Sequence, residues 1–409
     1  SLKHASSPPK FRMAPSAVAP APPACHAKHT LKGHTASVLG LTFTKNGRYV
    51  MSASQDKSLR LWNPFTGVHV KTYAGPHNHE VNDVVVTDDN SKFISCGGDK
   101  HFFQWDVTTA QVIRKFVGHD RKVNALAFGP GQDIVLSASH DKTVRIWDLR
   151  SRARGPIQTL ADSTDSVLCV CVAGDEITTG STDGGMRRYD VRKGQLIVDQ
   201  LLQPIGSICF SRDRECVLVS TLDDNIRLME CDTGNQLACY RGHTNKRFKV
   251  RSMLDPSNAY VVSGSEDGKI CFWDLAEANM LCSLKEHEGP VLCCQFFEDT
   301  LVTAGVAGNI MVWSVALQAQ AVTPLDTVRA CSSRSPGSHA AVAVDGLPMA
   351  FGRSAIRKTG PEPAKSIVGP PNQVAAPPAA GPPAADQVAS TLAAASRDQE
   401  ESRADEIVA

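Results

Sequence analysis

Histidine, aspartate and serine recur near one another in a pattern that could perform hydrolytic chemistry. His119 is followed by Ser137 or Ser139, and then by Asp141. A Ser–His–Asp set is the catalytic arrangement of many hydrolases. With the indole N–H of Trp147, the same side chains could instead form a buried hydrogen-bonded chain, in which each polar group satisfies another. Repetition separates the two hypotheses, because an active site occurs once and a structural unit recurs.

The Trp147 position recurs at a regular period between residues 62 and 313. The series is Trp62, Trp105, Trp147, Tyr189, Met229, Trp273 and Trp313, with steps of 43, 42, 42, 40, 44 and 40 residues. Each position except the last has an aspartate shortly before it, at a turn where Asp is favoured, and Ala307 is the exception. A Gly-His opening and a Trp-Asp end at this period are typical of β-propeller blades, small four-stranded sheets that cannot bury their faces alone.

We therefore interpret the recurrent histidines, aspartates and tryptophans as structural, with Ser263 or Ser265 supplying the hydroxyl in the sixth unit. The fourth and fifth units are degenerate, since Tyr189 and Met229 replace tryptophan, and we expect them to depend on apolar packing and to be locally weaker. The predicted structural network comprises His34, Asp56, Trp62, His77, Asp99, Trp105, His119, Asp141, Trp147, Asp183, Asp267, His243, Trp273, His287 and Trp313.

The ends of the repeat region predict how the ring closes. The last unit stops near Val315 without a fourth strand, whereas residues 27–32 precede the first Gly-His pair as an outer strand would. We expect these residues to complete the seventh blade, because closure removes open sheet edges. The sequence thus predicts an all-β, seven-bladed propeller over residues 27–315. The blades are expected at about 33–72, 73–116, 117–160, 161–200, 201–240, 241–284, and 285–315 with 27–32.

The two flanking regions differ in composition from the repeats. Residues 1–26 are rich in proline and alanine, and residues 316–409 lose the periodicity and become rich in alanine and proline, so both are predicted to be disordered. Deleting residues 1–32 should destabilise the domain, and deleting residues 1–20 should not. The N-terminus has no signal-peptide pattern, and no apolar run is long enough to span a membrane.

Composition narrows the possible partners. A net charge of +1 gives no overall field that would attract nucleic acid or an anionic membrane. The 13 cysteines form no zinc-like set and are typical of small core residues in a reducing compartment, with a reactive thiol as the alternative. The sequence therefore predicts no cofactor, metal, small-molecule substrate or membrane contact. It favours a cytoplasmic and nuclear location.

Two groups of basic residues are candidate partner-binding sites. The sixth unit has three extra residues, which lengthen the loop that holds Lys246, Arg247 and Lys249. Inserted loops on one rim of a propeller are commonly binding elements. The second group, on the opposite rim of two neighbouring units, could accept an acidic or phosphorylated peptide or an RNA backbone. For both groups the alternative is solvated charge without a partner. The second group comprises Arg150, Arg152, Arg154, Arg187, Arg188, Arg192 and Lys193.

Several segments resemble one family of WD-repeat proteins, the mitogen-activated protein kinase organiser. They include Lys57 to Pro64, Asp148 to Arg152, Gly180 to Leu196 with its Arg-Arg-Tyr-Asp run, Cys209 to Asp213, and Gly242 to Asn245. The resemblance covers about residues 28–315. It implies a scaffold that holds kinases of a mitogen-activated cascade, and also an association with the spliceosome.

Three classes of function can be compared. The first is a non-catalytic scaffold, a monomeric propeller within larger protein complexes, which raises the effective concentration of its partners. The second is an enzyme, but the sequence has no metal-ligand spacing, no phosphate-binding glycine loop and no unrepeated catalytic set. The third is direct RNA binding, which the low content of five Tyr and five Trp disfavours, because stacking platforms need interleaved aromatic residues. We therefore predict that this protein is not an enzyme.

Overall fold

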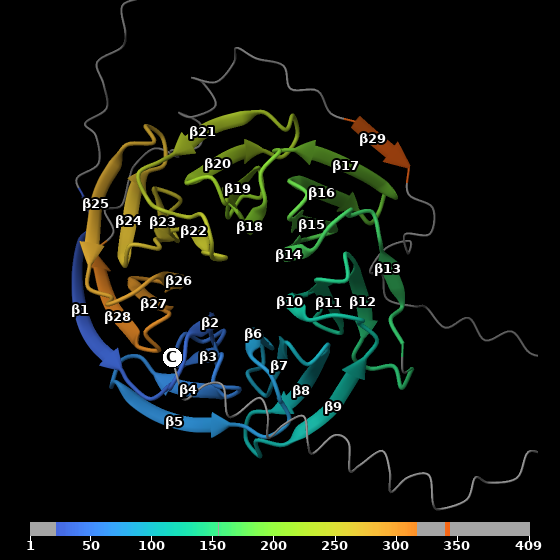
Figure 1. Ribbon diagram of the computed structural model, residues 1–409, viewed down its shortest axis with the longest axis horizontal. Helices are drawn as coiled ribbons and strands as arrows, with labels where there is room; N and C mark the ends of the chain where they lie inside the picture. The colour runs from blue at the N-terminus through green and yellow to red at the C-terminus, as the bar shows by residue number, and fades with distance from the viewer. Residues whose placement is uncertain (1–21, 154, 317–339, 344–409) are drawn as a thin grey trace, which may run out of the picture. The chain divides into compact units, whose positions relative to one another are not determined.

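The computed structural model describes residues 22–153, 155–316 and 340–343, and every regular element within them is a β-strand. The chain divides into two units, Ser1–Arg353 and Ser354–Ala409, and all described residues lie in the first. Seven antiparallel sheets are arranged in a ring (Figure 1). The predicted seven-bladed propeller is confirmed.

Blades one to three each contain four consecutive strands, ordered from the inside of the ring to the outside. Blade one is β2 (Val38–Phe43), β3 (Val50–Ser54), β4 (Leu59–Asn63) and β5 (Val68–Tyr73). Blade two is β6 (Val81–Val86), β7 (Lys92–Gly97), β8 (His101–Asp106) and β9 (Val112–Val117). Blade three is β10 (Val123–Phe128), β11 (Ile134–Ser139), β12 (Val144–Asp148) and β13 (Gln158–Leu160).

Blades four to six repeat this order, and blade seven takes its fourth strand from the N-terminal region. Blade four is β14 (Val167–Ala173), β15 (Glu176–Ser181), β16 (Gly185–Asp190) and β17 (Gln195–Gln200). Blade five is β18 (Ile205–Phe210), β19 (Cys216–Thr221), β20 (Asn225–Glu230) and β21 (Gln236–Tyr240). Blade six is β22 (Ser252–Leu254), β23 (Tyr260–Gly264), β24 (Lys269–Asp274) and β25 (Met280–Lys285). Blade seven is β26 (Val291–Phe297), β27 (Thr300–Gly305), β28 (Ile310–Ala316) and β1 (Ala24–Leu31).

The N-terminal strand closes the ring. β1 pairs antiparallel with β28, from Ala24 opposite Ala316 to Leu31 opposite Ile310. The predicted leader of residues 1–26 is wrong at its end, because β28 continues to Ala316 and offers backbone partners as far as Ala24. Residues 1–21 lie outside the described part of the chain.

A short strand beyond the repeats joins blade four. β29 (Ala340–Ala343) pairs antiparallel with β17, from Gln195 opposite Ala343 to Val198 opposite Ala340. The prediction that residues 316–409 lack regular structure is wrong at these four residues and at Ala316, which ends β28. The outer edge of β17 has unpaired backbone groups that a further strand can use. The remaining residues of that region lie outside the described part.

The hydrophobic core is divided among the joints between neighbouring blades. At the joint of blades two and three, Phe102 and Phe116 pack against Trp147, which is 1% exposed. At the joint of blades seven and one, Leu31 and Ile310 pack with Trp62. Each sheet thus buries both faces against its neighbours, which explains why the units must be repeated and the ring closed.

Candidate functional site

The structure joins histidine, aspartate, serine and tryptophan into one hydrogen-bonded chain in each of blades one to three. In blade three, His119 Nδ1 lies 2.7 Å from Asp141 Oδ2, and His119 Nε2 lies 2.7 Å from Ser137 Oγ. The Trp147 indole N–H donates to Ser137 Oγ over 2.8 Å. Because a carboxylate only accepts, Nδ1 carries the proton, and Nε2 accepts from the serine hydroxyl. The equivalent chains are His34, Asp56, Ser52 and Trp62 in blade one, and His77, Asp99, Ser95 and Trp105 in blade two.

The burial of the serine excludes a hydrolase role for these sets. Ser137 is 0% exposed, and its oxygen accepts the Trp147 indole N–H. A substrate carbonyl cannot reach this oxygen, and the chain recurs in three blades. The arrangement therefore satisfies buried polar groups within each of these three blades.

Blade seven keeps a shorter version of the chain. His287 Nε2 lies 2.8 Å from Thr303 Oγ1, which also accepts the indole N–H of Trp313 over 2.9 Å. Ala307 occupies the aspartate position, and its side chain cannot accept a hydrogen bond from the histidine. Burial lowers the pKa of His287 to about 4.

The prediction of a complete chain in blade six is wrong. Within the described residues, neither ring nitrogen of His243 has a hydrogen-bond partner, and the Trp273 indole N–H donates to the carbonyl oxygen of Arg241. Asp267 instead bonds Lys269, and the hydroxyl of Ser263 donates to the carbonyl oxygen of Gly264. Blade six, in which these partners differ, is also the blade with the lengthened loop after His243. His243 retains an edge-on ring contact with Trp273, with centroids 5.4 Å apart.

Blades four and five replace the histidine with an arginine. Arg187 Nη2 lies 2.9 Å from Asp183 Oδ2, and Arg227 Nη2 lies 2.6 Å from Asp223 Oδ2. Burial by itself raises the pKa of Asp223, but the hydrogen bonds from Arg227 and Thr221 outweigh it and hold the pKa at about 2. These blades lack the complete chain, as predicted, but the expectation that they depend on apolar packing missed these two ion pairs. The sequence did contain a signal for these ion pairs. In each of the two units, which lack the histidine, an arginine follows the aspartate by four residues.

The acid dependence of stability should report on the blade-three chain. Burial raises the pKa of Asp141, but hydrogen bonds from His119 and Thr143 outweigh it and hold the pKa well below its ordinary range. A lowered folded-state pKa stabilises the protein above the unfolded-state pKa of about 3.9, and this stabilisation is lost as the pH falls toward the folded-state value. Asp141→Asn should therefore cost about 1–3 kcal/mol at pH 7, and less at progressively more acid pH.

Urea unfolding from pH 7 down to pH 3 measures this difference between Asp141→Asn and the parent. Asp120→Asn is the control, since the Asp120 side chain is 85% exposed. A destabilisation by Asp141→Asn that stays constant over this pH range would contradict an ionised Asp141 as the source of the effect.

The lengthened loop of blade six is fixed in place but does not present all three of its basic side chains. Glu266 Oε1 accepts the backbone N–H groups of residues 246, 247 and 248, and Lys246 pairs with Asp224 over 3.2 Å. Lys246 and Arg247 are exposed. Lys249 is half-buried and turns into the ring, where its Nζ donates to the Asn124 carbonyl oxygen. Its assignment to the exposed loop surface is therefore wrong, because Lys249 ends the loop just before β22 and its side chain reaches Asn124 of blade three.

Two residues of the second basic group are buried and bound internally. Arg187 forms the ion pair with Asp183 described above, and Arg188 pairs with Asp199 and donates to the carbonyl oxygen of Cys231. Their side chains are 8% and 4% exposed, respectively. The prediction that Arg187 and Arg188 contact a partner is wrong, because they lie within β16 between neighbouring sheets.

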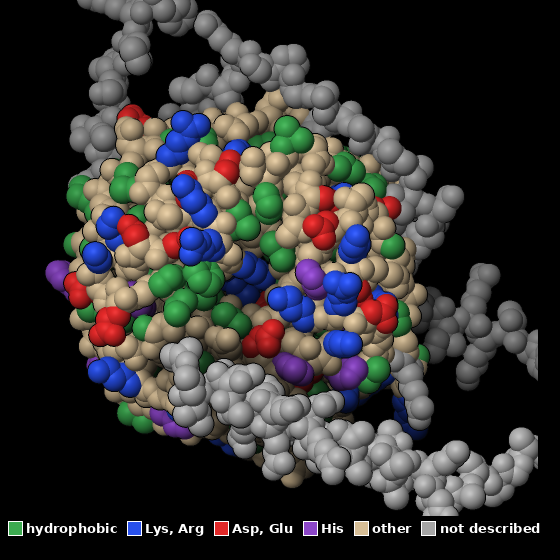
Figure 2. Space-filling view, viewed as in Figure 1, with side chains coloured by type: hydrophobic (Ala, Val, Ile, Leu, Met, Phe, Trp, Pro, Cys, Tyr) green, Lys and Arg blue, Asp and Glu red, His purple; other side chains and the backbone are tan. Residues whose placement is uncertain are grey.

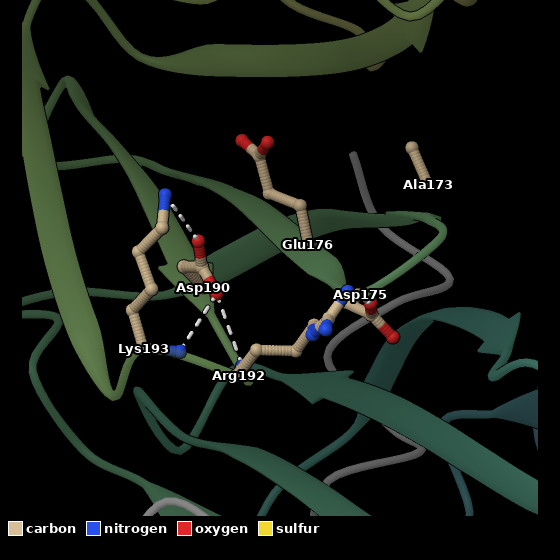
Figure 3. Close-up of a pocket in the computed structure, with 6 residues that line it drawn as sticks. All are labelled: Ala173, Asp175, Glu176, Asp190, Arg192 and Lys193. Atoms are coloured by element: carbon tan, nitrogen blue, oxygen red, sulfur yellow. Dashed lines mark hydrogen bonds and ion pairs between the residues drawn. The ribbon is translucent and has the colours of Figure 1, made fainter. Parts of the chain in front are cut away.

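Nearby carboxylates neutralise the positive charge of the exposed blade-four members of the second group. Arg192 lies 3.5 Å from Asp175, and Lys193 lies 3.2 Å from Asp190. These residues line a hollow of about 540 Å³, which also contains Glu176 (Figure 3). The hollow therefore holds more carboxylates than cations, which does not suit an acidic peptide or RNA.

The described blade-three members of the second group lie in the connection between β12 and β13. Arg150 lies 3.1 Å from Asp133, and Arg152 is exposed. Arg154 lies outside the described residues. Among the described residues, no cluster of three or more His, Cys, Asp or Glu side chains could hold a metal ion, and no helix there is long and apolar enough to cross a membrane.

The repeated chains, the blade period and the closed ring define a WD-repeat β-propeller. The family described as WD domain, G-beta repeat matches residues 25–63, 67–106, 110–148, 234–274 and 278–314. The longest interval without a match, residues 149–233, includes blade four and the first three strands of blade five. Proteins of this class are typically non-catalytic interaction scaffolds.

Comparison with curated proteins narrows the class further. The chain is 43% identical over 298 residues to WD repeat domain-containing protein 83 of Homo sapiens, covering 72% of this chain and 94% of that protein. It is 41% identical over 285 residues to the Rattus norvegicus protein of the same name, covering 69% and 90%. The Dictyostelium discoideum homolog is 28% identical over 314 residues, covering 69% and 96%. The chain belongs to the WD repeat domain-containing protein 83 family.

Proposed function

We propose that this propeller is a scaffold that assembles kinases of a mitogen-activated protein kinase cascade. Support comes from the WD-repeat family and from the segments that resemble the kinase organiser. The observation that carries the binding role is the lengthened loop, in which one carboxylate of Glu266 fixes three successive backbone N–H groups. A fixed loop loses little conformational entropy when a partner docks.

The loop has the chemistry of a docking element. Phe248 is 40% exposed and directly follows the exposed residues Lys246 and Arg247. An exposed aromatic residue beside cations suits a partner with a hydrophobic residue flanked by acidic ones. We place such a partner in the cytoplasm and nucleus.

Reversing the exposed charges of the loop tests the proposal. Lys246→Glu with Arg247→Glu should weaken kinase co-precipitation about tenfold and leave the melting temperature unchanged, since neither side chain is buried. Arg121→Glu with Lys122→Glu is the matched control, because these exposed residues occupy the corresponding connection in blade three. Equal recovery of kinases by both double variants would exclude the loop as their docking element.

The alternative proposal is a spliceosomal component that acts in pre-mRNA splicing through protein contacts. It rests on the same family resemblance. Mass spectrometry of proteins bound to the parent and to the loop variant separates the two functions. Recovery of splicing proteins without kinases would favour the alternative.

A further inference from the structure

A cavity of about 190 Å³ lies at the centre of the ring, among the inner strands of blades two to seven. Residues from six different blades line it, so its chemistry belongs to the whole ring rather than to one repeat. Lys and Arg side chains are visible at the centre of the face shown in Figure 2. At about 30 Å³ for each molecule of liquid water, the volume corresponds to roughly six waters, which is room for one polar side chain.

Two of the charged residues that line the cavity, Arg251 and Asp83, form an ion pair with each other. Arg251 Nη2 lies 2.5 Å from Asp83 Oδ1, and Asp83 also accepts the backbone N–H groups of Val84 and Leu126. The side chains of Arg251 and Asp83 are 22% and 5% exposed. Burial by itself lowers the pKa of Arg251, but Asp83 outweighs it and raises the pKa above its ordinary value. Asp83 therefore has little accepting capacity left for a second cation.

Lys249 is the cation in excess. It donates to the carbonyl oxygen of Asn124 over 3.1 Å, and no ion pair of the described residues includes it. Asp83 is the one carboxylate among the described residues that line the cavity, against two cations, Lys249 and Arg251. Burial and the neighbouring Arg251 lower the pKa of Lys249, the direction expected for a cation short of negative charge. An ammonium group has three donors, so Lys249 can still bind an anion.

We propose that this cavity receives the carboxylate of an Asp or Glu side chain from an extended segment of a partner protein, with Lys249 as its ion-pair partner. The inference rests on the scaffold function proposed above and adds its recognition chemistry. A protein segment is favoured over a free anion, because Phe248, the residue directly before Lys249, is 40% exposed on the fixed loop and offers an apolar contact. A segment that packs on Phe248 lies next to Lys249. Its acidic residue then supplies the second carboxylate for the two cations of the cavity, Lys249 and Arg251.

Binding of peptides to the whole protein tests this site. The probes are three fluorescent nine-residue libraries, randomised except for a central Glu, Gln or Lys, with affinity read by fluorescence polarisation. We expect the parent to select peptides from the Glu library alone. Lys249→Met should weaken the selected peptides at least tenfold, because it removes the unpaired cation. Lys122→Met is the matched control, since Lys122 directly precedes Val123 as Lys249 precedes Val250, but it is exposed.

Each outcome bears on the proposal. Equal binding of the Glu and Gln libraries by the parent would overturn it whether or not Lys249→Met folds. Lys249-dependent binding of inorganic phosphate with no selection of Glu peptides would assign the cavity to a free anion and also overturn it. If Lys249→Met retains both the Glu peptides and the kinases, the cavity proposal fails and the scaffold function stands. If Glu peptides bind but no kinase is recovered by the parent, the cavity stands and the kinase assignment fails.

Discussion

Deletion of residues 1–31, which removes β1, is expected to abolish the cooperative folding of the ring. β1 supplies the fourth strand of blade seven and pairs with β28 along its whole length (Figure 1). Leu31 is 1% exposed and packs with Trp62 and Ile310 at the joint of blades seven and one. Loss of a buried leucine side chain alone costs about 2–5 kcal/mol, against a total stability of roughly 5–15 kcal/mol for a typical domain. The deletion also leaves the backbone of β28 unpaired at an open edge.

Thermal unfolding followed by circular dichroism, together with size-exclusion chromatography, measures the effect. A chain that starts at Pro22 retains all of β1 and is the matched control. Leu31→Asp separates the buried contact from the strand pairing, and should also lower the melting temperature strongly. A chain starting at Lys32 that melts cooperatively at the temperature of the control would show that β1 does not hold the ring closed.

The sequence period predicted the fold because each blade buries the faces of a four-stranded sheet in the same way, against its two neighbours. The Trp147 register places a large aromatic side chain at a joint between sheets, and the missing fourth strand of the last unit requires β1. These consequences follow from residue types and spacing alone. The strand pairing of β29 with β17 carries no such signal, because its four residues are small, apolar and outside the period.

The candidate site was harder to predict because burial cannot be read from charge. Arg187 and Arg192 lie close together in the sequence, yet one is buried against Asp183 and the other is exposed beside Asp175. Lys249 stands next to an exposed phenylalanine but turns into the ring. Sequence reasoning missed Asp83 and Arg251 entirely, although a charged residue on the inner strand β6 and another directly before β22 were a usable signal.

Trp147→Ala is expected to cost about 3–5 kcal/mol, the range for truncating a buried large aromatic side chain. Trp147 is 1% exposed, and its ring contacts those of Phe102 and Phe116 with centroids 5.2 and 6.0 Å away. The substitution empties the joint of blades two and three and removes the donor to Ser137. Urea unfolding measures the cost, with Phe65→Ala as control, since Phe65 is 51% exposed. Equal stabilities of the two variants would contradict the buried role of Trp147.

Trp147→Phe separates packing from hydrogen bonding at the same position. It keeps most of the ring contact but leaves Ser137 without its indole donor, at an expected cost of about 1–3 kcal/mol. Because His119 shares that serine, His119→Ala and Trp147→Phe should be strongly non-additive, with a coupling of about 0.5–3 kcal/mol. His243→Ala with Trp273→Phe provides the contrast, because that indole donates to a backbone carbonyl and the two rings share only an edge contact. A coupling in blade six as large as that in blade three would mean that ring packing, rather than the shared serine, links the histidine to the tryptophan.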